Sequence, residues 1–99
     1  MDAMPDPGLE ARVREIARAV PEVAAIEQCR LRKMGGHFFV DMHVHVDPDM
    51  TVVQSHAVAH RVKDAVREKL PNVYDVLIHI EPARRDAPSP EGQGRAGSG

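Results

Sequence analysis

The feature that most constrains the fold is the strict alternation in residues 37–47, "HFFVDMHVHVD". Every even position from Phe38 to Val46 is apolar, and every odd position apart from Phe39 is a histidine or an aspartate. Successive side chains of a β-strand point to opposite faces of a sheet, so this period of two predicts a strand with one buried face. The other face would carry imidazole and carboxylate groups side by side.

The segment before this strand predicts a helix that begins at Pro7. Asp6 suits the N-cap and Pro7 the first helical position, while Pro21 stops the run. The apolar residues between them recur at helical spacing: Leu9, Val13, Ile16 and Val20.

Residues 22–34, "EVAAIEQCRLRKM", predict a strand. It ends at Gly35 and Gly36, a pair typical of a tight hairpin turn. This strand should therefore pair antiparallel with the alternating strand that follows.

Residues 51–70 predict a second helix, in which Thr51 and Gln54 can form a capping box and after which Pro71 ends the run. Its expected buried face consists of Val52, Val58, Ala59, Val62, Ala65, Val66 and Leu70. Residues 72–82 predict the last strand, with one apolar face made of Tyr74, Val76, Ile78 and Ile80.

The element order αββαβ predicts an α+β domain. The second strand, second helix and third strand form a βαβ unit, whose crossover makes the two strands parallel and puts the alternating strand in the middle. Both helices need the apolar side of these strands, so they should cover one face of a three-stranded mixed sheet. We expect this domain to span residues 6–84, between a disordered leader, 1–5, and a disordered tail, 85–99, rich in Pro, Gly and Ser.

Composition excludes several classes of function. The chain has 13 Lys and Arg against 15 Asp and Glu and only three aromatic residues, so no nucleic-acid surface is indicated. The single cysteine, Cys29, fits a reducing compartment and hence a cytoplasmic location. No run approaches the roughly 20 apolar residues that span a bilayer. No nucleophile or acid–base pair can be named, so we do not expect an enzyme.

The uncovered face of the predicted sheet mixes apolar and ligand-type side chains. Phe39 and Leu77 lie among its histidines and carboxylates, which is not an ordinary solvated surface. A small domain usually covers such a face by pairing with a copy of itself, so we expect a homodimer.

Two histidines and a glutamate on this face could share a metal ion. His43 and His79 are expected to point to the same face of adjacent parallel strands, and Glu81 lies on that face two residues after His79. The alternative is that they are exposed strand residues that only solubilise the domain, and the pattern alone leaves both interpretations open. His45 is a credible extra ligand on the same face.

The second helix carries two more histidines. His56 lies at the margin of the predicted buried stripe, where it could reach past the sheet edge or simply bond to a backbone carbonyl. His60 is expected on the opposite side of that helix, so we do not expect the two to form a helical zinc pair despite their i, i+4 spacing.

The motifs together resemble the cytoplasmic C-terminal domain of the cation diffusion facilitator transporters, which export zinc, iron and manganese. The resemblance runs from Leu9 to Pro82 and is carried by Arg30, Arg32 and Gly35 as R-x-R-x-x-G, and by "DMHVHVDP", "QSHAVAH" and "HIEP". It implies a ferredoxin-like, metallochaperone-like fold that pairs as a V-shaped dimer. The metal ligands it implies are His43, His56, His79 and Glu81, with Glu27 at a position where relatives use His or Asp.

This resemblance leads to a functional hypothesis. The chain would be a regulatory metal-sensing domain of a divalent-cation efflux transporter, which closes its homodimer when it binds Zn²⁺, with Mn²⁺ or Fe²⁺ as other candidate ions. The transmembrane part of the same transporter would be its partner. Two alternatives use the same fold: a stand-alone cytosolic metal chaperone or buffer, and a small-molecule-binding regulatory module in which the histidines are incidental.

Overall fold

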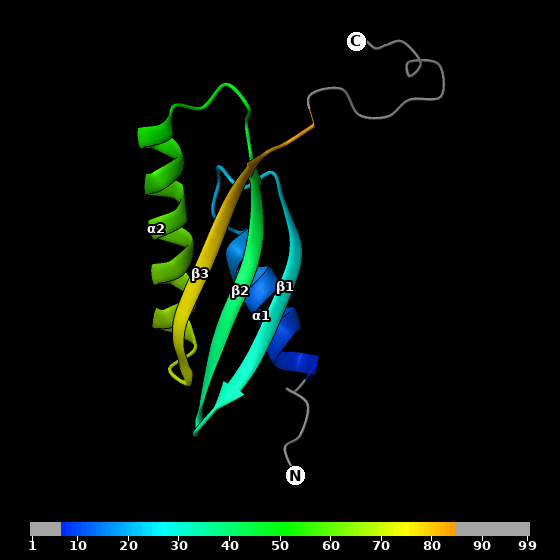
Figure 1. Ribbon diagram of the computed structural model, residues 1–99, viewed down its shortest axis with the longest axis vertical. Helices are drawn as coiled ribbons and strands as arrows, with labels where there is room; N and C mark the ends of the chain where they lie inside the picture. The colour runs from blue at the N-terminus through cyan, green and yellow to red at the C-terminus, as the bar shows by residue number, and fades with distance from the viewer. Residues whose placement is uncertain (1–6, 85–99) are drawn as a thin grey trace, which may run out of the picture.

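The computed structural model describes residues 7–84, which fold in the predicted order αββαβ. Figure 1 shows the elements: α1 (Pro7–Arg18), β1 (Ala25–Met34), β2 (His37–Val46), α2 (Val52–Lys69) and β3 (Val73–Pro82). The predicted cap at Asp6, the leader 1–5 and the tail 85–99 lie outside the described residues.

The sheet has the predicted topology. Its strand order is β1-β2-β3, with β1 antiparallel and β3 parallel to the central β2. Both helices lie on one face of the sheet, and the opposite face is left without a covering element among the described residues (Figure 1). The α+β fold class is therefore confirmed. Neither helix is long and apolar enough to cross a membrane.

Local signals explain where α2 begins. The Gln54 backbone N–H donates to Thr51 Oγ1 at 3.0 Å, and the Thr51 N–H donates to Gln54 Oε1 at 2.9 Å, which completes the predicted capping box. In the second half of the helix, Lys63 Nζ lies 3.2 Å from Asp75 Oδ1, so a half-buried ion pair joins α2 to β3.

The core lies between the helices and the apolar face of the sheet. Among residues 7–84 it contains 15 buried apolar residues: Leu9, Val13, Ala17, Val20, Cys29, Val40, Met42, Val44, Val46, Val58, Val62, Val66, Leu70, Val73 and Val76. The even positions of β2 supply four of these, at most 3% exposed, as the alternation predicted.

The prediction that Val52 is buried is wrong, because this side chain is 79% exposed. The fully buried stripe of α2 begins at Val58, six residues after Val52. Six residues rotate about 600° around the helix axis, which is about 120° short of two full turns. Val52 therefore points about 120° away from the stripe.

The prediction for Tyr74 is also wrong. The register of β2 and β3 shifts between Phe38 and Phe39, which pair with Val73 and Asp75, so Tyr74 is skipped. Val73 takes the buried place, and Tyr74, 57% exposed, has its ring 5.3 Å from that of Phe39.

A second irregularity lies in β1. Glu27 pairs with His43 and Cys29 with Met42, so Gln28 is an extra residue, with a φ of 53° in the left-handed region. This bulge puts Glu27 on the open face and Cys29 in the core. A regular strand would have put both on the same face.

Candidate metal centre

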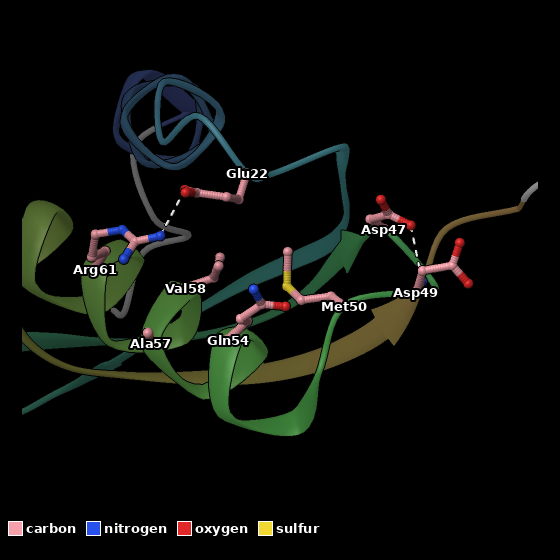
Figure 2. Close-up of a pocket in the computed structure, with 8 residues that line it drawn as sticks. All are labelled: Glu22, Asp47, Asp49, Met50, Gln54, Ala57, Val58 and Arg61. Carbon is pink, nitrogen blue, oxygen red and sulfur yellow. Dashed lines mark hydrogen bonds and ion pairs between the residues drawn. The ribbon is translucent and has the colours of Figure 1, made fainter.

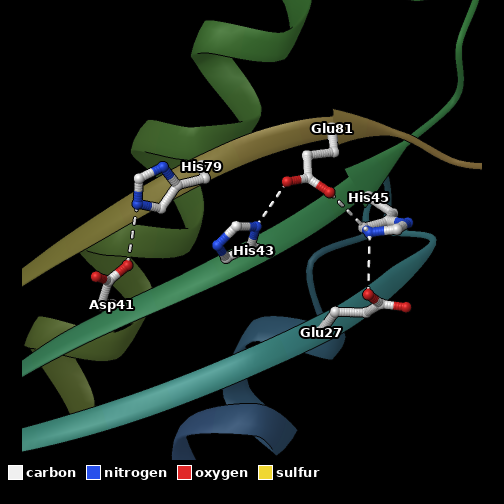
Figure 3. A network of polar contacts seen from close by, with 6 residues as sticks. All are labelled: Glu27, Asp41, His43, His45, His79 and Glu81. Carbon is white, nitrogen blue, oxygen red and sulfur yellow. Dashed lines mark hydrogen bonds and ion pairs between the residues drawn. The ribbon is translucent and has the colours of Figure 1, made fainter.

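Six imidazole and carboxylate side chains gather on the sheet face turned away from the helices (Figure 3). This group, called the sheet-face cluster below, consists of Glu27, Asp41, His43, His45, His79 and Glu81. It contains four of the five predicted ligands and adds His45 and Asp41.

The strand register brings these residues together in rows across the sheet. Glu27, His43 and His79 are direct neighbours on β1, β2 and β3. In the next row His45 pairs with Glu81 on β3 and with Ala25 on β1. Adjacent strands lie about 4.8 Å apart, so the backbone alone holds these side chains within reach of a shared ion.

His43 is the centre of the first row. Its ring stacks on that of His79, with centroids 4.7 Å apart and planes 24° from parallel. Its Nδ1 lies 2.6 Å from Glu81 Oε2. This hydrogen bond lowers the pKa of the Glu81 carboxyl below its usual value, while partial burial opposes the change. When Nδ1–H donates to the carboxylate, a neutral His43 keeps a lone pair on Nε2.

His79 makes a similar contact with Asp41. Its Nε2 lies 3.0 Å from Asp41 Oδ1, which leaves Nδ1 as the other ring nitrogen. Asp41 thus lies beside an imidazole. A carboxylate in this position fixes the orientation of the ring.

His45 is the most buried side chain of the cluster, at 17% exposed. Its Nε2 lies 3.4 Å from Glu81 Oε1 and 3.7 Å from Glu27 Oε1. Neither contact is a hydrogen bond, and among the residues that the structure describes this nitrogen is the one buried side-chain N or O atom without a hydrogen-bond partner.

His56 does not join the cluster within one chain. It lies on α2, on the helix side of the sheet, where it is exposed, and its ring centroid is 5.6 Å from that of His60. The expectation that His60 points to the opposite side of the helix is therefore wrong, since residues four apart lie about one helical turn apart on the same face.

The donor set fits a divalent cation by its chemistry. Imidazole nitrogens and carboxylate oxygens suit Zn²⁺ and Mn²⁺, and the unpartnered His45 nitrogen points to a missing partner. As the side chains stand in a single chain, however, no three His, Cys, Asp or Glu residues within 7–84 are arranged to enclose an ion. The exposed carboxylate of Glu27, at 61%, is the member of the cluster most free to move.

An apolar area adjoins the cluster on the same face. Tyr74 and Leu77 are 57% and 58% exposed. Phe39 and Leu77 also line a hollow of about 220 Å³ together with Arg32 and Asp41. The open face therefore combines exposed apolar surface with the polar cluster, as the sequence predicted.

A second hollow, of about 400 Å³, lies at the other side of the fold, where the connection after α1 meets α2 (Figure 2). Glu22 Oε1 and Arg61 Nη2 lie 2.7 Å apart at its edge, and Met50 and Val58 line its wall. The ion pair lowers the pKa of the Glu22 carboxyl. This hollow is separate from the sheet-face cluster, with which it shares no lining residue.

Comparison with protein families identifies the chain. The family described as "Cation efflux protein, cytoplasmic domain" matches residues 5–83. The chain belongs to this cation efflux family. The predicted resemblance to cation diffusion facilitators is therefore confirmed.

Curated relatives in the cation efflux family include the manganese efflux system protein MneP of Bacillus subtilis, 27% identical over 82 residues. The cation-efflux pump FieF of Cronobacter sakazakii is 32% identical over 80 residues. These alignments cover 83% and 81% of the chain but only 28% and 26% of the relatives. The chain thus spans little more than a quarter of the length of these two proteins.

Solved structures support the same fold. A variant of the MamM C-terminal domain in a cadmium form has a TM-score of 0.76 and 28% sequence identity, and the match covers 79% of this chain and 98% of that one. A nickel form of another variant matches with a TM-score of 0.77. Variants of the MamM domain, which has the same fold, have therefore been solved in forms named for cadmium and for nickel.

Proposed function

We propose that this chain is the metal-responsive regulatory domain of a divalent-cation efflux transporter. It binds Zn²⁺ on the open face of its sheet, and the bound metal favours a closed homodimer. The observation that carries the proposal is the row formed by Glu27, His43 and His79, direct neighbours on three strands, with Glu81 beside them.

The chain's own residues supply donors of the right kind. His43 and His79 each use one ring nitrogen to contact a carboxylate, at 2.6 and 3.0 Å, and keep the other nitrogen for a cation. The carboxylates of Glu27 and Glu81 balance the charge of a divalent ion and lie on the outer two strands. Bound metal would supply the attraction that holds these groups together.

A second copy of the chain completes the site in this proposal. The open face carries exposed Tyr74 and Leu77, and burial of such side chains stabilises a dimer. His56 lies in the helix layer and reaches a cluster only if a second copy brings it there. Metal then favours the closed dimer by its difference in affinity for the two states, and a 100-fold difference supplies about 2.7 kcal/mol.

Membership of the cation efflux family supports the transporter context. MneP and FieF are named for efflux of manganese and of cations, and the match covers about a quarter of each. We propose that this domain acts at the cytoplasmic face of the membrane, where closing of the dimer would change the position of the attached transmembrane part. Zinc, rather than manganese or iron, is the ion that we propose, because two imidazoles lie side by side in the row.

The test compares zinc-induced stabilisation of the parent with that of two variants. His79→Ala removes a proposed ligand, and His37→Ala is the matched control, a histidine on the same sheet face whose ring lies beside Tyr74. Zinc should raise the melting temperature of the parent and of the control but much less that of His79→Ala. Small-angle scattering with and without zinc should show the dimer becoming more compact. Equal stabilisation of all three proteins, or none in the parent, would contradict the proposal.

A further inference from the structure

The unpartnered nitrogen of His45 carries an inference that rests on the metal-binding function proposed above. His45 is absent from the ligand set that the family resemblance implies. Its Nε2 is nevertheless the buried polar atom without a hydrogen bond among residues 7–84, and it faces two carboxylates. A buried polar atom without a partner costs about 1–3 kcal/mol, so such atoms are rare and call for a physical reason.

The charges around His45 show what is missing. A lone pair on Nε2 that faces Glu81 Oε1 and Glu27 Oε1 would be repelled by both carboxylates, so this nitrogen must carry a proton or bind a cation. A proton on Nε2 is one candidate. It would normally draw a carboxylate oxygen to about 2.8 Å, whereas the observed distances are 3.4 and 3.7 Å.

A metal ion fits these distances better than a proton. Ligand atoms about 2.1 Å from a tetrahedral Zn²⁺ are about 3.4 Å from one another. The Nε2–Oε1 distance is 3.4 Å from His45 to Glu81 and 3.7 Å from His45 to Glu27. The three groups do not enclose an ion as they stand, so the Glu27 carboxylate has to move to complete the site. Glu27 is 61% exposed, so it can make this adjustment by side-chain rotation at little cost.

The strand register favours the same three residues. His45 and Glu81 are direct neighbours in the β2–β3 ladder, and the residue opposite His45 on β1 is Ala25, whose small side chain leaves space beside the imidazole. Glu27 enters this space from two positions along β1. The other oxygen of Glu81 accepts the hydrogen bond from His43 at 2.6 Å, and this bond fixes the orientation of the carboxylate. Metal ligands are commonly oriented in this way by hydrogen bonds to neighbouring groups.

We propose that His45 is a metal ligand of this chain, which binds a divalent cation through Nε2 together with the carboxylates of Glu81 and Glu27. The site combines one imidazole with two carboxylates, a set that accepts Zn²⁺ and also Mn²⁺. His43 orients Glu81 through Nδ1, and its Nε2 remains available for the metal binding proposed above.

The experiment measures zinc affinity of the full chain by calorimetry at neutral pH. His45→Gln keeps a side chain of similar length but removes the imidazole, and His37→Gln is the control at the other end of the same strand and face. His45→Gln should weaken zinc binding by about 100-fold or more, since even the loss of outer partners costs about 10- to 100-fold. His37→Gln should bind as the parent does.

A second measurement makes the outcome independent of how the variant folds. Imidazole ¹⁵N–¹H spectra of the parent, recorded with and without saturating zinc, report the state of each ring nitrogen. His45 Nε2 should change from its free signal to a metal-bound one. If it stays free or protonated while the parent binds zinc, or if His45→Gln binds zinc as tightly as the parent, the His45 assignment is overturned and the wider function survives. If the parent itself binds no zinc, both fail.

Discussion

Replacement of Gln28 by glycine tests the bulge that positions Glu27. Gln28 has a φ of 53°, in the left-handed region, where an L-residue with a Cβ loses about 1–2 kcal/mol. Glycine adopts this conformation without the steric cost but loses about 0.5–1 kcal/mol more conformational entropy on folding. Gln28→Gly should therefore stabilise the domain by about 0.5–1 kcal/mol.

Chemical denaturation and thermal melting of the metal-free protein measure this gain. For a domain of this size 1 kcal/mol corresponds to roughly 4–8 °C in melting temperature, so the expected rise is about 2–8 °C. The control is Arg30→Gly, at an exposed position of the same strand that pairs regularly with Asp41. There glycine brings only its entropic cost and should destabilise the domain by about 0.5–1 kcal/mol.

The two glycine variants must change stability in opposite directions. If Gln28→Gly destabilises the protein as much as Arg30→Gly does, then Gln28 is not in a left-handed conformation and β1 has no bulge there. Glu27 and Cys29 would then share one face of the sheet, and Glu27 could not lie opposite His43 while Cys29 lies in the core.

Two further predictions concern the core. Val62→Ala removes two buried methyl groups and should cost about 2 kcal/mol in unfolding free energy, whereas Val52→Ala on the same helix should stay within about 0.5 kcal/mol, as denaturant titration would show. Burial raises the pKa of the Cys29 thiol to about 11 from 9.0, so at pH 8 it should react with iodoacetamide about 100-fold more slowly in the native protein than in urea. The native rate should rise with pH towards 11, and stability should fall between pH 9 and 11 as the thiolate is favoured in the unfolded chain; equal native and unfolded rates would contradict burial.

The periodic parts of the fold could be predicted from the sequence, because local chemistry determines them. The alternation in β2, the capping box of Thr51 and Gln54 and the glycine pair before β2 each act within a few residues. The φ of +59° at Gly35 agrees with the predicted tight turn. The fold followed because two helices and three strands with these apolar faces have one compact arrangement.

The irregular parts could not be predicted from periodicity. A period of two assumes a regular ladder, but Gln28 and Tyr74 are extra residues in their strands, and nothing in the local sequence marks them. Both depend on pairing with β2, which is a non-local property. The one available hint was that Glu27 and Cys29, with opposite preferences for water, stand two residues apart.

The contacts within the cluster were harder to predict than its location. The alternation of side chains along the strands predicted that His43 and His79 lie on the same face. It could not predict that Glu81 contacts both His43 and His45. That arrangement depends on side-chain rotation and on the exact pairing of β2 with β3. For the same reason His45 could be recognised only as an extra candidate in the sequence.

The apolar face of β2 holds the cluster in place. A slip of β2 by one residue would turn Val40, Met42, Val44 and Val46 to water and bring the histidines into the core. Burial of each of these four side chains contributes about 1.5–3 kcal/mol, so the slip would cost about 6–12 kcal/mol, comparable with the whole stability of a small domain. The sheet-face residues therefore keep their positions without metal, and substitutions among them can change metal affinity while the strand register stays fixed. The same argument makes a buried position of β2, and not a cluster residue, the place where a polar substitution would abolish folding and metal binding together.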